Sequence, residues 1–116
     1  MIEPHLLKFD SFDELEKGLL TSTQMAEKLP FLVKRVFWVQ NVNPDKTRGS
    51  HAGYKTEEIL IAIQGNVTVQ IQTLTRRKSE FILHQPNHGL YIPPKCWRTL
   101  SFSEDAILLC LASTDY

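Results

Sequence analysis

After Pro30 the chain is divided into short runs rich in β-branched and aromatic residues, and each run is closed by Pro, Gly, Asn or Ser-Glu-Asp. Strands that recur about every 8–12 residues are typical of a sandwich or a barrel. A length of 116 residues fits one domain. The sequence therefore predicts an all-β sandwich or barrel over residues 1–116. The runs are FLVKRVFWVQNV, EILIAIQGN, VTVQIQTL, SEFILHQ, GLYIPP, WRTLSF and AILLCLAS.

Two turns are expected within this region. Gly65 and Asn66 close the first apolar run, and the residues that follow alternate apolar and polar side chains. Such alternation indicates a strand with one buried face, and a Gly-Asn pair is a hairpin signal. We therefore predict that the runs EILIAIQGN and VTVQIQTL form a hairpin about Gly65-Asn66. The cationic stretch Arg76–Lys78 is expected to be a solvated hairpin tip.

The first thirty residues carry weaker signals. Ser11 and Glu14 have the spacing of a capping box, which predicts a short helix ending near Gly18. Residues 21–29 could form a second helical turn or a loop.

Charge and cysteine content exclude several classes. The 13 basic and 13 acidic residues give a formal charge of zero, which argues against binding to nucleic acid or an anionic membrane. No run approaches the roughly 18 apolar residues of a membrane span, and the first ten residues do not resemble a secretory signal. We therefore expect a cytoplasmic protein in which Cys96 and Cys110 are reduced.

A partial ligand set appears around His51. In metal-binding cupins, which are small jelly-roll barrels, one strand pair carries a pattern close to G-x5-H-x-H-x4-E-x6-G and another carries P-x4-H. This chain has His51, Gly53, Glu58 and Gly65 in the first pattern, and Arg98 at the ligand place of the second. Glycine offers no ligand, and a guanidinium is not deprotonated to bind a metal. We therefore expect a cupin barrel with no metal and no other cofactor.

His51 can still act without a metal. An imidazole titrates near neutrality, which suits it to moving protons, and arginine suits the recognition of phosphate. The alternative is that His51 is a satisfied or exposed barrel histidine, and its position leaves both readings open. The neighbouring side chains that would suit a phosphorylated or nucleotide-linked small molecule are Arg48, Tyr54, Lys55, Glu57, Glu58, Tyr91, Trp97 and Arg98.

Taken in order, the segments KRVFWV, RGSHAGYK, EEILIAIQG, GLYIPPKCW and LASTDY resemble the sugar-nucleotide 3,4-ketoisomerases. These are WxcM-like, metal-free cupins that act on dTDP-4-keto-6-deoxyglucose. The resemblance implies a homodimeric jelly roll whose partner is a nucleotide-linked deoxy sugar. It also implies a role in making 3-amino-3,6-dideoxy sugars for bacterial surface glycans, including lipopolysaccharide.

The resemblance assigns roles to particular residues. The family signature R-G-x-H-A-H-K carries two histidines that face the sugar, and Arg48 and His51 occupy its arginine and first histidine places. His51 would then remove the proton at carbon 3, and Arg48 and Arg98 would hold or polarise the substrate. The other matched positions are Gly49, Ala52, Lys55, Glu57, Trp97 and Arg98, the last of which is His or Arg in the family.

The chain also departs from the family pattern. Gly53 replaces the second histidine, and Phe37 and Trp38 replace a pair of tyrosines. Lys17 stands where many members have arginine, so we keep it as a substrate-binding cation. Tyr54, next to the gap at Gly53, could supply the missing proton donor.

We favour a metal-independent ketoisomerase in which His51 moves a proton between sugar carbons 3 and 4. The alternative is a non-catalytic or divergent cupin that binds a nucleotide sugar without isomerising it. Two further expectations concern side-chain burial. Trp38 should lie in the core, and one of Glu57 and Glu58 should be solvated, because successive side chains of a strand face opposite ways.

Overall fold

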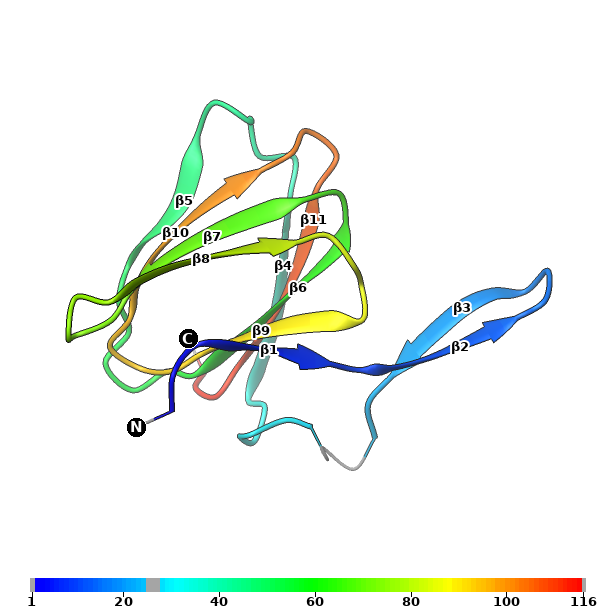
Figure 1. The fold of residues 1–116 in the computed structure, drawn as a ribbon, viewed down its shortest axis with the longest axis horizontal. Helices are drawn as coiled ribbons and strands as arrows, with labels where there is room; N and C mark the ends of the chain where they lie inside the picture. The colour runs from blue at the N-terminus through cyan, green and yellow to red at the C-terminus, as the bar shows by residue number, and fades with distance from the viewer. Residues whose placement is uncertain (1, 25–27, 116) are drawn as a thin grey trace.

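Two antiparallel sheets face one another, and a two-stranded hairpin projects from them (Figure 1). The computed structural model describes residues 2–24 and 28–115, and every regular element in those ranges is a strand, so the all-β prediction is confirmed. The first sheet contains β1 (His5–Lys8), β4 (Arg35–Gln40), β6 (Glu58–Gln64), β9 (His88–Ile92) and β11 (Ile107–Ala112). The second contains β5 (Thr47–His51), β7 (Val67–Gln72), β8 (Lys78–Leu83) and β10 (Trp97–Phe102), and the hairpin is β2 (Asp10–Glu14) with β3 (Gly18–Ser22).

The strand order shows how the chain alternates between the two sheets. The first sheet has the order β1-β9-β6-β11-β4, and the second has the order β5-β10-β7-β8. Each sheet therefore combines strands that are far apart in the sequence. β6 and β11 are interior strands of the first sheet and β10 is an interior strand of the second, whereas β5 lies at an edge (Figure 1).

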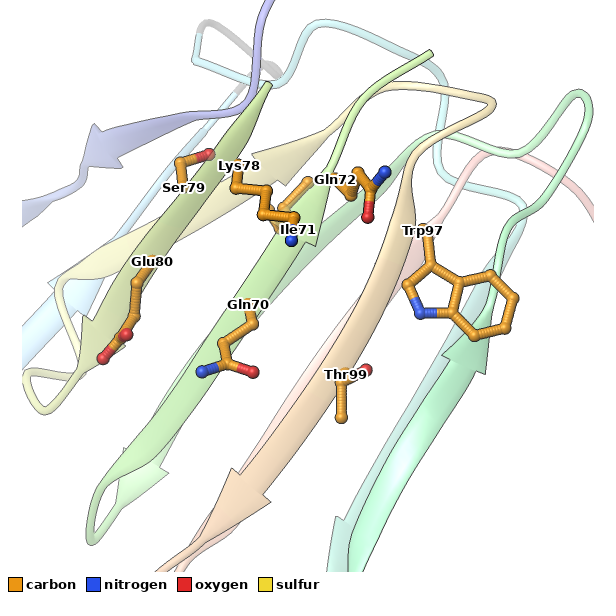
Figure 2. A pocket seen from close by; sticks show the side chains of 8 residues that line it. All are labelled: Gln70, Ile71, Gln72, Lys78, Ser79, Glu80, Trp97 and Thr99. Atoms are coloured by element: carbon orange, nitrogen blue, oxygen red, sulfur yellow. The ribbon is translucent and has the colours of Figure 1, made fainter. Parts of the chain in front are cut away.

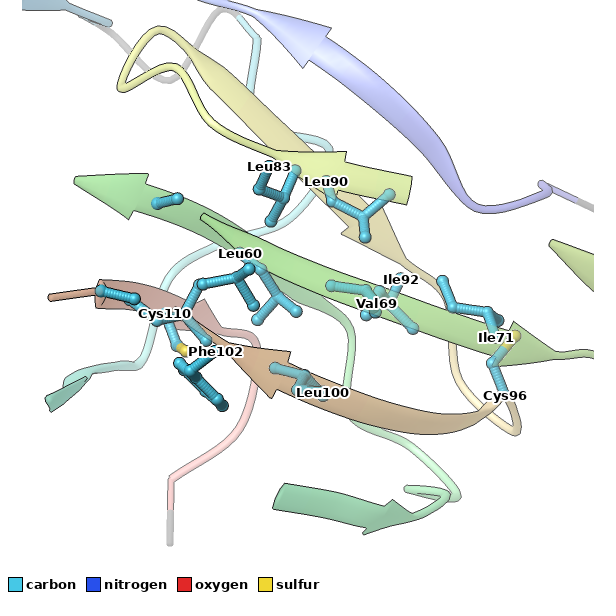
Figure 3. Close-up of a cluster of buried hydrophobic side chains, with 14 residues drawn as sticks. Leu60, Val69, Ile71, Leu83, Leu90, Ile92, Cys96, Leu100, Phe102 and Cys110 are labelled. Carbon is cyan, nitrogen blue, oxygen red and sulfur yellow. The ribbon is translucent and has the colours of Figure 1, made fainter. Parts of the chain in front are cut away.

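The core lies between the two sheets, where apolar side chains from both point toward one another (Figure 3). Strand β7 explains the pattern: Val67, Val69 and Ile71 are buried, whereas the intervening polar residues face outward, as a period of two requires. The buried members of this cluster are Leu60, Ala62, Val67, Val69, Ile71, Leu83, Leu90, Ile92, Cys96, Leu100, Phe102, Ala106, Leu108 and Cys110.

Strand β6 is buried on both faces, which explains its nearly continuous apolar sequence. Leu60 belongs to the core between the sheets, whereas Ile59 and Ile61 belong to a second cluster with Phe9 and Tyr91 on the outer face of the first sheet. Partly buried side chains, including that of Phe31, cover this second cluster. The first sheet therefore has its central strand fixed from both sides.

The predicted hairpin at Gly65 is wrong, although both of its strands and its turn exist. β6 pairs with β9 and β11, whereas β7 pairs with β8 and β10. The chain crosses from one sheet to the other at Gly65-Asn66, and Asn66 donates its amide to the Ser103 hydroxyl at 2.9 Å. Alternation identifies a strand but does not identify the strand with which it pairs.

The predicted helix near Ser11 is also wrong, because residues 10–22 form the β2–β3 hairpin. The Ser11 and Thr21 hydroxyls are hydrogen-bonded across the pair at 2.9 Å. The turn contains Glu16 and Gly18 at positive φ, which a helix does not allow. Of the segment 21–29, residues 21 and 22 belong to β3, and residues 25–27 lie outside the described residues.

Two expectations about exposure had opposite outcomes. Arg76 lies in the turn between β7 and β8 and is exposed, so the hairpin tip at this cationic stretch is confirmed. Trp38 is 64% exposed, so its predicted place in the core is wrong. It lies on edge strand β4, whose inward positions are taken by Phe37 and Val39. Among the described residues, no helix is long and apolar enough to span a membrane.

We expect Gly65→Ala to destabilise the fold more than Gly18→Ala. Both glycines have positive φ, which costs an alanine about 1–2 kcal/mol. A Cβ at Gly65 would also lie 2.6 Å from the Ser103 hydroxyl and 2.7 Å from the Ala106 Cα, whereas a Cβ at Gly18 would have no atom within 4 Å. Overpacking should add about 1–3 kcal/mol at Gly65. Urea unfolding of both variants at one protein concentration measures the difference, and equal losses would contradict it.

Candidate functional site

A small polar cavity lies between the sheets, where β5 and β10 pair and β6 begins. Its volume is about 90 Å³. Polar groups from β5, β6 and β10 form one side of it, and apolar side chains form the rest. This composition can hold a small polar group of a ligand while excluding bulk water. The lining residues are Phe37, Val39, Arg48, Gly49, His51, Glu58, Leu60, Arg98, Leu100, Phe102, Leu108 and Cys110.

His51 ends strand β5 with a defined ring tautomer. Its Nδ1 lies 2.6 Å from the backbone carbonyl oxygen of Gly49. A carbonyl oxygen only accepts hydrogen bonds, so Nδ1 carries the proton and Nε2 is the basic nitrogen of the neutral ring. His51 is exposed and also lines the cavity, so it lies at the rim. An imidazole in this state can accept a proton from a group bound in the cavity.

Arg98 lies beside His51 in the strand register and forms a buried ion pair. Its guanidinium donates to the Glu58 carboxylate, and the two side chains are 3% and 10% exposed. Burial lowers the pKa of Arg98 to about 10, which leaves it charged at neutral pH. Its Nε has no hydrogen-bond partner. This nitrogen is a buried donor beside the cavity, and such donors are costly unless a ligand or water accepts from them.

The floor of the cavity is chemically inert. Cys110 is buried, and burial raises the pKa of its thiol to about 12. A thiol with so high a pKa is not a nucleophile at neutral pH. Cys96 is also a buried free thiol, so neither cysteine forms a disulfide. The reactive groups of the cavity are therefore those of its polar side.

Gly53 carries no side chain two residues beyond His51. It follows β5 in a loop, and its carbonyl oxygen accepts a hydrogen bond from the Lys95 amide at 2.6 Å. A Cβ added at Gly53 would have Thr56 as its nearest neighbour, at 3.4 Å, so the backbone there has room for a Cβ atom. In residues 2–24 and 28–115, no three His, Cys, Asp or Glu side chains gather where they could hold a metal ion.

Glu57 and Glu58 each accept a hydrogen bond from another side chain, and neither is exposed, so the prediction that one is solvated is wrong. Glu58 faces the cavity, whereas Glu57 is half-buried and accepts a hydrogen bond from the Tyr91 hydroxyl at 2.7 Å. Strand β6 begins at Glu58, so the alternation rule does not extend to Glu57. Burial, followed by this hydrogen bond, raises the pKa of Tyr91.

Tyr54 and Tyr91 lie apart from the cavity of His51. Together with Leu74, Pro93 and Cys96 they line a different hollow of about 400 Å³. Tyr54 is 82% exposed. The structure therefore does not bring Tyr54 to His51, although the two are close in the sequence.

Trp97 faces the opposite side of the second sheet from Arg98. Figure 2 shows its ring on the outer face of that sheet with Gln70, Gln72 and Thr99, and these residues line a hollow of about 490 Å³. Trp97 and Arg98 are neighbours in β10, so one must point outward when the other points into the barrel. The structure therefore separates Trp97 from the cavity.

Two predicted cations also lie outside the cavity. Lys55 is exposed in the loop after β5. Lys17 occupies the turn of the β2–β3 hairpin, which points away from the barrel (Figure 1). Within one copy of the chain, the structure brings together His51, Arg48 and Arg98 from the predicted set.

Sequence reasoning gave too little weight to Glu58. It occupies the carboxylate place of the metal-binding cupin pattern and here binds Arg98, which occupies a ligand place of the second pattern. In metal-binding cupins these two positions converge on one ion. A carboxylate at one and a guanidinium at the other therefore indicated that the two side chains would meet. Charge complementarity at those two positions predicts an ion pair in place of a metal.

Comparison with known proteins identifies the family. The model of the family described as FdtA: WxcM-like, C-terminal matches residues 3–116. The chain belongs to the WxcM-like family. The WxcM-like chain is 31% identical over 101 residues to TDP-4-oxo-6-deoxy-alpha-D-glucose-3,4-oxoisomerase of Aneurinibacillus thermoaerophilus, an alignment that covers 86% of this chain and 72% of the relative.

Solved structures of 3,4-ketoisomerases share the fold of the WxcM-like chain. The sugar 3,4-ketoisomerase QdtA from Thermoanaerobacterium thermosaccharolyticum, in complex with TDP, has a TM-score of 0.91 and 34% identity, covering 98% of this chain and 82% of that one. A histidine-to-asparagine mutant of QdtA with TDP-4-keto-6-deoxyglucose has a TM-score of 0.92 and 32% identity, covering 100% and 83%. The resemblance of the sequence to these ketoisomerases is therefore confirmed.

We expect Glu58→Gln to destabilise the WxcM-like chain more than Glu57→Gln. The first change leaves the Arg98 charge buried without a counter-charge, and breaking a buried pair costs about 3–5 kcal/mol. The second weakens one hydrogen bond to Tyr91, which is worth about 0.5–1.5 kcal/mol. Urea unfolding at a fixed protein concentration measures both. Equal losses would show that the Arg98 charge does not depend on Glu58.

Proposed function

We propose that this protein is a metal-independent TDP-sugar 3,4-ketoisomerase that acts on a dTDP-4-keto-6-deoxyhexose. The family and the relatives that isomerise TDP sugars support this reaction class. The product would be a 3-keto sugar nucleotide that serves the synthesis of deoxyamino sugars for bacterial surface glycans, including lipopolysaccharide. The two free thiols fit a cytoplasmic location, where cysteines stay reduced.

The observation that carries the proposal is the hydrogen bond from His51 Nδ1 to the Gly49 carbonyl. It leaves Nε2 as a proton acceptor at the rim of a cavity that also contains the Arg98 guanidinium. A base and an adjacent cation are what enolisation next to a ketone requires. The cavity of about 90 Å³ suits the reacting edge of a sugar, with the nucleotide outside it.

The reaction moves two protons between neighbouring atoms. His51 Nε2 takes the proton from carbon 3, and the electron pair of that bond becomes the double bond of an enediolate with its charge on oxygen 4. The hydroxyl proton of oxygen 3 passes to oxygen 4, and His51 returns its proton to carbon 4. Oxygen 3 is then the carbonyl oxygen. Arg98 and Arg48 would stabilise the negative charge while it lies on these oxygens.

The test follows the carbon-3 proton of dTDP-4-keto-6-deoxyglucose in heavy water by NMR. We expect the carbon-3 proton signal to disappear and a 3-keto product to form. His51→Asn should lower the rate about 10²–10⁴-fold, the usual contribution of a positioned acid or base. His84→Asn is the matched control, because it removes an exposed imidazole of the loop between β8 and β9. An unchanged rate in His51→Asn would exclude His51 as the base.

The second candidate function is binding of the nucleotide sugar without isomerisation, and the missing side chain at Gly53 favours it. Gly53→His restores the missing histidine and therefore separates the two candidates. The backbone has room for its Cβ, which would meet no atom closer than 3.4 Å. Line broadening of the substrate without exchange in the wild type, followed by turnover in Gly53→His, would establish a binding protein that lost a proton carrier. Turnover in the wild type would reject this candidate.

We also propose that the protein is a homodimer. The β2–β3 hairpin projects from the barrel (Figure 1) and exposes apolar side chains, including Phe12 and Leu20, which are 54% and 60% exposed and oppose each other in the pair. An isolated two-stranded hairpin is marginally stable in water, so packing against a second copy would stabilise it. Lys17, in the turn of this hairpin, would then meet substrate only in the site of the second copy.

Light scattering after size exclusion tests this proposal. We expect a mass of about 27 kDa, twice the 13.4 kDa of the chain. The double change Phe12→Ser and Leu20→Ser should shift the mass toward the monomer at micromolar concentration. Leu74→Ser is the matched control, because Leu74 is 64% exposed in the turn between β7 and β8. A wild-type monomer would overturn the dimer.

A further inference from the structure

The outer face of the second sheet carries polar and aromatic side chains in two rows. Every second residue of β7, β8 and β10 faces away from the core, and the strand register places these residues side by side. One row crosses the strands as Trp97, Gln72 and Lys78, and the other as Thr99, Gln70 and Glu80. The two rows line the hollow of Figure 2, whose volume of about 490 Å³ lies within the range of about 300–1,000 Å³ for small-molecule sites.

Trp97 supplies an apolar platform at one edge of this hollow. It is 49% exposed, although indole is among the largest apolar groups in proteins. The face of an aromatic ring carries partial negative charge. It therefore attracts the weakly positive C–H groups on one face of a pyranose ring, while the hydroxyl groups around the rim of that ring stay free for hydrogen bonds.

Gln70 and Gln72 offer polar groups beside this platform. A side-chain amide both donates and accepts hydrogen bonds, and so does a sugar hydroxyl. One amide can therefore bind two neighbouring hydroxyls, and the Thr99 hydroxyl adds a further donor and acceptor. Within residues 2–24 and 28–115, the side chains of Gln70, Gln72 and Thr99 form no hydrogen bond with the rest of the chain. Their polar atoms thus face whatever occupies the hollow.

The charge of the hollow favours a neutral ligand. Among the described residues that line it, Lys78 and Glu80 are the charged ones, and their charges cancel. A phosphate-rich ligand needs a cluster of cations. A protein partner needs an apolar interface core, but the one aliphatic residue among these lining residues, Ile71, is buried beneath the face. An uncharged molecule with many hydroxyls and one flat apolar face satisfies the platform and the amides together.

We propose that the outer face of β10, β7 and β8 is a binding site for a neutral oligosaccharide, with Trp97 stacked on one sugar ring. Gln72 and Gln70 bind the hydroxyls of that ring and of the next one. The sheet separates this site from the cavity of His51, because Trp97 and Arg98 point to opposite sides of β10. The site is therefore independent of the proposed ketoisomerase reaction.

Saturation-transfer difference NMR with cellohexaose tests the site, because this probe is a neutral chain of flat pyranose rings. We expect saturation transfer to the sugar from the wild type and none from Trp97→Ala. Trp97→Phe keeps a smaller platform and should give a reduced signal. Gln72→Ala should weaken affinity about 2- to 12-fold, the value of one hydrogen bond. Trp38→Ala is the matched control and should bind as the wild type does, because Trp38 is an exposed tryptophan of the first sheet.

Four results would overturn the proposal. Absence of transfer from the wild type would show that the face does not bind a neutral saccharide. Binding by Trp97→Ala that equals the wild type would exclude the platform. Equal losses in Trp97→Ala and Trp38→Ala would indicate adsorption to any exposed aromatic ring. Displacement of cellohexaose by TDP would place the sugar in the cavity of His51, whereas an unchanged signal with TDP present supports a separate site.

Discussion

The buried ion pair between Arg98 and Glu58 organises the functional end of the barrel. It joins β10 of the second sheet to β6 of the first, so it ties together the two layers that enclose the core. A buried pair contributes little net stability, because desolvation opposes the attraction of the two charges, but losing one partner is costly. The sequence must therefore keep both residues or neither. What the pair maintains is a polar surface inside an otherwise apolar sandwich.

The polar surface around Arg98 and Glu58 is the part of the cavity that carries reactive side chains. His51 reaches the cavity because β5 is an edge strand that ends beside Arg98, and the Gly49 carbonyl fixes its ring. Gly49 has a φ of +90°, and a Cβ there would lie 2.9 Å from Leu100, so another residue would disturb the strand that carries His51. The sandwich thus sets the position of His51, and the exposed end of edge strand β5 gives it access to solvent.

Much of the fold could be predicted from local patterns, and the errors have physical causes. Alternation in residues 67–72 identified β7 correctly, because burial of one face imposes a period of two. Pairing was predicted wrongly at Gly65, since a turn signal does not reveal whether the chain returns to the same sheet. The capping-box pattern at Ser11 occurs within a strand pair, and Trp38 is exposed because β4 is an edge strand. In the site, spacing found His51 and Arg98, but the partnership of Glu58 required three-dimensional proximity.

The gap at Gly53 bears on how one imidazole could serve both carbons. Carbons 3 and 4 are adjacent, so a base on one face of the ring reaches both after a small shift, and a second base is needed only when the two protons lie on opposite faces. A proton held on His51 at the rim also meets solvent, because the residue is exposed. Exchange with water then competes with transfer to carbon 4. Same-face transfer is therefore compatible with a single histidine, and in the proposed reaction Arg98 would stabilise the intermediate until carbon 4 is protonated.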